Sequence, residues 1–168
     1  PLDAPSDNEL ALLSVRVGAA LQERGLVAVT AESCTGGYVA KLLTDVPGSS
    51  GWFDSGLVTY SNTSKQRYLG VTAETLRLSG AVSERTVQEM AQGALAVSGA
   101  DLAVAISGVA GPDGGTADHP VGDVWFARAR RRPGGAVELG ASHRRFQGSR
   151  DDIRRLSAAY ALRLLLDD

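Results

Sequence analysis

The fold of this chain is decided by the stretch Leu26-Val27-Ala28-Val29-Thr30-Ala31-Glu32-Ser33-Cys34-Thr35-Gly36-Gly37. Its first half is short, apolar and rich in β-branched residues, which predicts a buried strand. Its second half is a hydroxyl-rich turn closed by two glycines, and the pattern that follows predicts a helix. A strand-to-helix turn lies at the carboxyl edge of an open α/β sheet, where ligands bind. We therefore expect Ser33 at that edge, followed by amides that are able to bind a phosphate or a developing oxyanion.

The composition is that of one globular domain. The chain has 168 residues, 43% of them hydrophobic and 21% charged, with a formal net charge of −2. This charge gives no global reason to expect nucleic acid as a partner. The single cysteine excludes an internal disulfide and favours a reducing compartment, and no apolar run reaches the roughly 18 residues of a membrane span. We expect a soluble, cytoplasmic protein with neither a nucleic-acid nor a membrane partner.

The order of helical and strand patterns predicts a three-layer α/β/α single domain with a mixed β-sheet. Residues 1–7 are expected to be a disordered tail and residues 8–168 the domain. Serines at helix starts and glycines at helix ends mark the boundaries between elements. After the first helix, strand and serine turn, we expect strands at Trp52–Tyr60, Asp101–Ile106, Val121–Arg131 and Ala136–Phe146, and helices ending near Leu69, Ser79, Gly99 and the C-terminus.

The residues that are missing narrow the chemistry. Neither a Gly-x-x-x-x-Gly-Lys-[Ser/Thr] phosphate loop nor a Gly-x-Gly-x-x-Gly fingerprint occurs, and His119 and His143 read as loop and exposed-strand residues rather than metal ligands. A hydroxyl nucleophile would then need a lysine or a tyrosine as its base. Lys65 falls in a predicted first helical turn, where the helix dipole should lower its pKa. A surface lysine, a turn serine at Ser33 and a packing role for Tyr60 remain the plain alternatives.

Two further elements could hold an anion. The glycine-rich loop Ser107–Gly115 follows an apolar strand, so it is either an ordinary loop or a place where a ligand approaches the backbone. Arg150 lies in the first turn of the last helix, where a cation is poorly placed for the dipole, and either recognises a charge or faces water. Cys34 reads as a small buried residue rather than a nucleophile. The remaining arginines are expected to form a solvated edge of the hairpin, namely Arg128, Arg130, Arg132, Arg144 and Arg145.

Several motifs in order give the chain a specific resemblance. They are Ala31-Glu32-Ser33-Cys34-Thr35-Gly36-Gly37, Leu43-Thr44-Asp45-Val46-Pro47-Gly48-Ser49-Ser50, Val58-Thr59-Tyr60-Ser61-Asn62 with Lys65, Gly80-Ala81-Val82-Ser83-Glu84, Ser107 through Thr116, and Pro120-Val121-Gly122. From about Leu10 onward the chain resembles the CinA C-terminal domain family, in its stand-alone nicotinamide-nucleotide amidohydrolase form of PncC type. The loop Ala117-Asp118-His119 and the arginine-rich hairpin depart from that pattern.

The resemblance implies hydrolysis of the carboxamide of nicotinamide mononucleotide to nicotinic acid mononucleotide and ammonia. It implies Ser33 as nucleophile, Lys65 as its base and Tyr60 as a hydroxyl that orients or relays the proton, without metal or cofactor and in a homodimer or larger homo-oligomer. The alternative is a catalytically silent nucleotide-binding or interaction module of the same fold. Substrate contacts are expected from Thr35, Gly36, Gly37, Asn62, Ser107, Gly108, Gly111 and Arg150.

Overall fold

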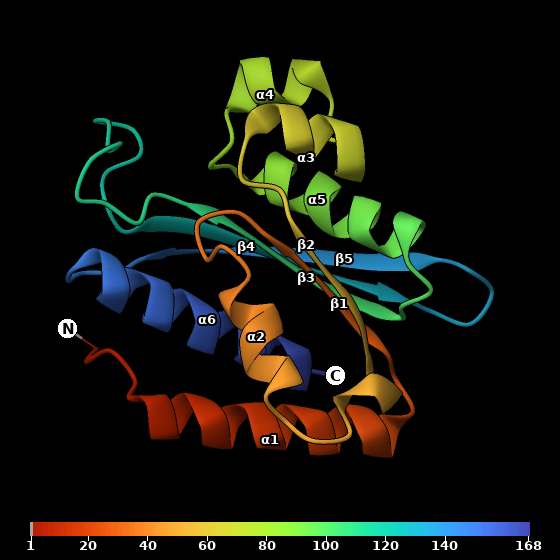
Figure 1. Cartoon of the computed structure of the whole chain (residues 1–168). Helices are drawn as coiled ribbons and strands as arrows, with labels where there is room; N and C mark the ends of the chain where they lie inside the picture. The colour runs from red at the N-terminus through yellow and green to blue at the C-terminus, as the bar shows by residue number, and fades with distance from the viewer. Residues whose placement is uncertain (1) are drawn as a thin grey trace.

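The computed structural model describes residues 2–168 and contains a mixed sheet between two layers of helices (Figure 1). Pro1, the first residue of the expected tail, lies outside the described residues. The helices are α1 (Asp7–Arg24), α2 (Tyr38–Thr44), the 3-10 helix η1 (Ser49–Gly51), α3 (Asn62–Leu69), α4 (Ala73–Ser79), α5 (Glu84–Val97) and α6 (Arg150–Leu166). The strands are β1 (Ala28–Glu32), β2 (Phe53–Val58), β3 (Leu102–Gly108), β4 (Asp123–Arg131) and β5 (Val137–Arg145). The predicted α/β/α architecture is confirmed.

The sheet has the order β2-β1-β3-β4-β5, with β1 between two parallel neighbours. Strands β4 and β5 are antiparallel and form the predicted hairpin at one edge. The parallel strands β1, β2 and β3 therefore all end at the same side of the sheet, which we call its carboxyl edge, and the antiparallel β4 begins there. Figure 1 shows the glycine-rich loop and the first turn of α6 at this same edge.

Successive side chains of the buried strands point to opposite faces of the sheet, so neighbouring residues pack against different helices. Leu102, Val104 and Ile106 of β3 pack with α1, α2 and α6, whereas Ala103 and Ala105 pack with α5. The small alanine side chains allow α5 to pack closely against the middle of the sheet. The same alternation puts Glu32, the last residue of β1, on the face covered by α2.

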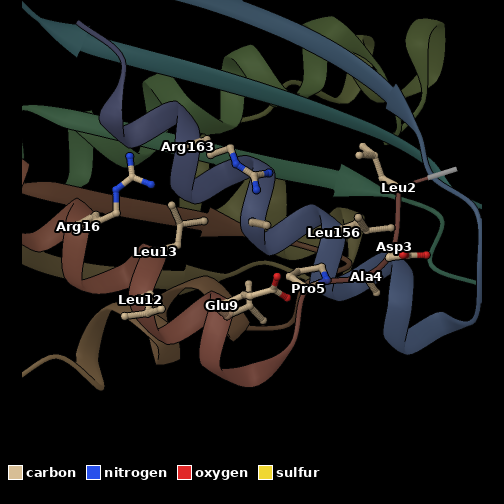
Figure 2. Close-up of a pocket in the computed structure, with 12 residues that line it drawn as sticks. Leu2, Asp3, Ala4, Pro5, Glu9, Leu12, Leu13, Arg16, Leu156 and Arg163 are labelled. Atoms are coloured by element: carbon tan, nitrogen blue, oxygen red, sulfur yellow. The ribbon is translucent and has the colours of Figure 1, made fainter.

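The segment before α1 contacts α1 and α6. Ser6 caps α1 in the predicted capping box with Glu9, and the Pro5 carbonyl accepts a hydrogen bond from Arg155 Nη1 at 3.3 Å. Residues 2–5 close a cavity of about 360 Å³ between α1 and α6, and none of the predicted site residues lines it (Figure 2). Within residues 2–168, no helix combines the length and apolar character that crossing a bilayer requires.

Candidate active site

Lys65 and Ser33 meet at the carboxyl edge of the sheet. The Lys65 Nζ lies 2.9 Å from the Ser33 Oγ, although the two residues are 32 positions apart in the chain. Their relative exposed areas are 1% and 7%, so the contact is shielded from bulk water. The same Nζ donates to the carbonyl oxygens of Thr59, at 2.9 Å, and Tyr60, at 3.1 Å.

Lys65 reaches this position because α3 begins immediately after β2. Ser61 caps the helix by accepting a hydrogen bond from the Ser64 amide, and Lys65 lies one turn into it. Burial lowers the pKa of Lys65 to about 8, because desolvation disfavours the ammonium form. The direction of the predicted shift agrees, but its main cause is burial rather than the helix dipole. Among residues 2–168, no carboxylate forms an ion pair with this lysine to oppose the shift.

The turn after Ser33 supplies free amides, although fewer than expected. The Gly36 amide donates to the Ser33 carbonyl at 3.0 Å and is therefore not free for a ligand, which corrects the expectation for that amide. The hydrogen bonds of residues 2–168 include no partner for the amides of Thr35 and Gly37. Gly36 and Gly37 have φ of 58° and 94°, which favours glycine over residues with a side chain. The buried hydroxyl oxygen of Thr35 also has no hydrogen-bond partner among residues 2–168.

Cys34 is not a nucleophile in this arrangement. Its side chain is buried, as predicted, and desolvation raises the pKa of the thiol to about 12. Because the thiolate is the reactive form of cysteine, this environment keeps Cys34 inert near neutral pH. Ser33 is therefore the nucleophile candidate in the turn.

Glu32, the last residue of β1, binds the start of α2 through its side chain. Its fully buried carboxylate accepts hydrogen bonds from the amides of Val39, at 2.9 Å, and Ala40, at 3.0 Å. These are first-turn amides that helices commonly leave for a capping group or an anion. The amides of Val39 and Ala40 are therefore not available to a ligand, because Glu32 already accepts from both.

Arg150 contacts two other predicted site residues from separate parts of the chain, Gly111 and Tyr60. Its Nη1 donates to the Gly111 carbonyl at 2.8 Å, and its Nη2 lies 3.3 Å from the Tyr60 Oη. Tyr60 has a relative exposed area of 62%, and its backbone carbonyl, not its hydroxyl, contacts Lys65. Arg150 and Tyr60 thus form an exposed polar pair next to the buried Ser33–Lys65 contact.

The other predicted substrate contacts differ in their surroundings. Ser107 is a buried residue of β3 and follows Ile106, whose carbonyl accepts the Ser33 amide at 3.0 Å, so Ser33, directly after β1, lies beside the end of β3. Asn62 is the exposed first residue of α3. Close packing explains the glycines at 108 and 111 without a ligand, because a side chain at either position would collide with its neighbours. A Cβ on Gly108 would lie 2.7 Å from the Asp123 carbonyl oxygen, and one on Gly111 would lie 2.5 Å from Val121 Cγ1.

The two histidines share one acidic partner that the sequence did not reveal. The buried carboxylate of Asp123 lies 3.0 Å from His119 Nδ1 and 2.5 Å from His143 Nε2. These contacts join the loop at His119 to β4 and β5. Within residues 2–168, no group of three or more His, Cys, Asp or Glu side chains is arranged to hold a metal ion.

The expectation of a solvated arginine edge is also wrong in one respect. Arg128 donates through Nε to the Leu164 carbonyl at 3.0 Å and through Nη2 to the Asp167 carbonyl at 2.6 Å, so it caps the end of α6. Carbonyls at a helix C-terminus lack intrahelical partners, which explains why a half-buried arginine is stable there.

Comparison with known proteins places this site in a family. The model of the CinA C-terminal domain matches residues 11–168. The chain belongs to the CinA C-terminal domain family. Nicotinamide-nucleotide amidohydrolase PncC of Escherichia coli is 54% identical over 160 residues, which cover 95% of this chain and 94% of that protein. The Pseudomonas putida protein of the same name is 47% identical over 154 residues, covering 92% of this chain and 93% of its own length.

Solved structures agree with this assignment of the CinA C-terminal domain fold. The crystal structure of competence/damage inducible protein CihA from Agrobacterium tumefaciens matches with a TM-score of 0.87 and 42% identity, covering 99% of this chain and 98% of that one. The resemblance from the motifs is thereby confirmed.

Proposed function

We propose that this CinA C-terminal domain hydrolyses the carboxamide of nicotinamide mononucleotide, giving nicotinic acid mononucleotide and ammonia. Relatives at 47% to 54% identity are nicotinamide-nucleotide amidohydrolases by name, which supports the same activity for this chain. The Lys65–Ser33 contact of 2.9 Å in a buried site is the observation that carries the proposal. An acyl transfer by serine requires a base within hydrogen-bond reach of the hydroxyl.

The three contacts of Lys65 fit an ammonium, which would donate to all three oxygens, and they also accommodate the neutral amine that the reaction needs. A neutral amine has two N–H groups and one lone pair. The Thr59 and Tyr60 carbonyls are able to accept the two N–H groups, which leaves the lone pair for the Ser33 hydroxyl proton. With a pKa of about 8, Lys65 has a substantial neutral fraction near neutral pH and still binds a proton well enough to return it.

The proposed reaction has two acyl-transfer steps. Lys65 takes the Ser33 proton as Oγ forms a bond to the carboxamide carbon, and the amides of Thr35 and Gly37 stabilise the oxyanion. The lysine proton then passes to the leaving nitrogen, the carbon–nitrogen bond breaks and ammonia departs. Water attacks the Ser33 ester, again losing a proton to Lys65, and the carboxylic acid leaves with Ser33 reprotonated. Tyr60 would orient the substrate amide or relay a proton through its hydroxyl.

The nucleotide part of the substrate has several candidate partners. An arginine guanidinium has five donors, and Arg150 uses two groups on Gly111 and Tyr60, so donors remain for a phosphate. Asn62, Ser107 and the loop glycines at 108 and 111 surround the same edge of the sheet. We propose that Arg150 binds the phosphate while the buried serine turn receives the carboxamide.

The direct test is release of ammonia and nicotinic acid mononucleotide from nicotinamide mononucleotide by the wild-type chain and by Ser33→Ala. Loss of all turnover in Ser33→Ala, with substrate binding retained, is the expected result. Cys34→Ala is a matched control because it changes the adjacent side chain, and it should keep most of the activity. Binding of the nucleotide without ammonia release by the wild type would instead indicate a silent binding module.

We also propose that the protein works in the cytoplasm as a homodimer or larger homo-oligomer. Leu12 and Val15 on the outer side of α1 have relative exposed areas of 67% and 53%, and apolar residues of this kind are common at subunit contacts. Sedimentation equilibrium of the purified chain would test this, and a monomer mass at micromolar concentration would refute it.

A further inference from the structure

Arg154 binds the backbone of the serine turn from α6. Its Nε donates to the Cys34 carbonyl at 3.3 Å and its Nη2 to the Thr35 carbonyl at 3.1 Å. The side chain is half-buried, and its Cζ lies 5.9 Å from the centre of the Tyr38 ring, which limits its freedom. One planar cation thus spans two consecutive peptide groups of the turn. None of the sequence motifs described above includes this arginine.

These two contacts act on the amides of the turn. The Cys34 carbonyl shares a peptide bond with the Thr35 amide, and the Thr35 carbonyl shares one with the Gly36 amide. Because a peptide group is delocalised, a cation on its oxygen makes its N–H a stronger donor. The Thr35 amide has no protein acceptor among residues 2–168, and the Gly36 amide holds the turn through the Ser33 carbonyl. Arg154 therefore strengthens the Thr35 amide as a free donor, and it strengthens the hydrogen bond from the Gly36 amide to the Ser33 carbonyl that shapes the turn.

We propose that Arg154 is a positioning residue that holds and polarises the Cys34–Gly36 peptide groups, so that the Thr35 amide stabilises the oxyanion that forms on the substrate when Ser33 attacks it. The inference rests on the proposed function, since it assigns Arg154 to the same acyl transfer. The effect requires no contact between Arg154 and the substrate. It also explains how a turn with several peptide groups in tight conformations keeps one geometry during the reaction.

A phosphate-binding role is the rival explanation for this arginine. Arg154 lines an open cavity of about 400 Å³ with Gly36, Gly37 and Lys41, where an anion could be bound. Two nitrogens of the Arg154 guanidinium, Nε and Nη2, already donate to backbone carbonyls, however. Lys41 forms an ion pair with Asp45 at 2.6 Å. The two roles affect different kinetic constants, because phosphate binding acts on the ground state as well as the transition state.

The kinetic test compares Arg154→Gln, Arg154→Lys and the adjacent control Arg155→Gln. Arg155 contacts Asp7 and Asp151, so its replacement removes a neighbouring charge without touching the turn. We expect kcat for nicotinamide mononucleotide to fall about 10-fold to 100-fold in Arg154→Gln, with KM within about threefold of wild type. Arg154→Lys should recover part of kcat, and the pKa seen in the kcat/KM profile should stay that of Lys65. A raised KM with unchanged kcat would overturn the proposal in favour of phosphate binding.

A second readout does not depend on turnover. Amide hydrogen exchange measured by NMR should become at least about tenfold faster for Gly36 in Arg154→Gln and should stay unchanged in Arg155→Gln, because only the first variant frees the turn. If the wild type does not hydrolyse nicotinamide mononucleotide, the proposed function fails, and this exchange measurement still decides whether Arg154 holds the turn. Unchanged exchange of Gly36 in Arg154→Gln would overturn the inference.

Discussion

Gly93 of α5 lies directly against the backbone carbonyl of Leu69 at the end of α3, so closely that a Cβ on Gly93 would be 1.8 Å from that oxygen. This contact lets α3 rest on α5 and brings Lys65, one helical turn earlier, down onto Ser33. Both partners are backbone, and neither can move aside as a flexible side chain would. The glycine therefore links the packing of two helices to the geometry of the proposed catalytic pair.

Gly93→Ala should lower both stability and activity. Overpacking at a rigid contact costs about 1–3 kcal/mol, and relief of the clash requires α3 to move away from α5. We expect a lower urea midpoint and a larger fractional loss of kcat than of substrate affinity. Gly99→Ala is the matched control, because a Cβ there meets nothing within 4 Å. Equal behaviour of the two variants would show that α3 does not depend on the Gly93 contact.

The pH dependence of turnover should report the buried amine. With a pKa of about 8 for Lys65, roughly one tenth of the amine is neutral at about pH 7. Since the neutral form is the base, kcat/KM should rise about tenfold per pH unit below the pKa and level off above it. The measurement is kcat/KM between about pH 6 and about pH 9.5. A flat profile across this range would remove Lys65 as the base.

Lys65→Arg supplies the matching variant. The guanidinium keeps the positive charge but cannot lose a proton in this pH range, so turnover should collapse while nucleotide binding persists. Isothermal titration with the substrate separates binding from chemistry in this variant. Near-normal kcat in Lys65→Arg would contradict a role for lysine in proton transfer.

The sequence predicted the parts of the site that local patterns determine. A strand, a serine and two glycines are contiguous, and the cap at Ser61 places Lys65 in a first turn, so both residues could be named from spacing. The cause of the lysine pKa shift could not be predicted, because the burial of Lys65 depends on how α3 packs against α5. Arg154 shares a helix face with Arg150, four residues earlier, and this spacing is the signal that could have indicated it. The Asp123 contacts join loop and hairpin residues across the fold and have no such local signal.

Glu32 tests how much the serine turn depends on its helix. Glu32→Gln replaces one carboxylate oxygen by an amide group that cannot accept from the α2 amides. Leaving a buried donor without an acceptor costs about 1–3 kcal/mol, and the start of α2 should loosen next to Ser33. Urea unfolding and kcat should both show a loss, whereas Glu74→Gln, at the exposed first turn of α4, should change neither. A stable, fully active Glu32→Gln would show that the turn holds its shape without this carboxylate.

Asp123 should make stability fall in acid. Burial alone would raise the pKa of this carboxyl, but the hydrogen bonds from His119 and His143 and the nearby charges of His143 and Arg145 hold it below its usual value. A carboxyl with a lowered folded-state pKa adds stability above its unfolded pKa of about 3.9, and this stability is lost as the pH falls through the lower folded value. Asp123→Asn should therefore cost about 1–3 kcal/mol near neutral pH and show a smaller further loss below about pH 4 than the wild type. Urea unfolding at several pH values measures both effects, with Asp118→Asn in the exposed loop as the control. An Asp123→Asn curve parallel to that of the wild type at every pH would mean that the two histidines do not stabilise the charged carboxylate.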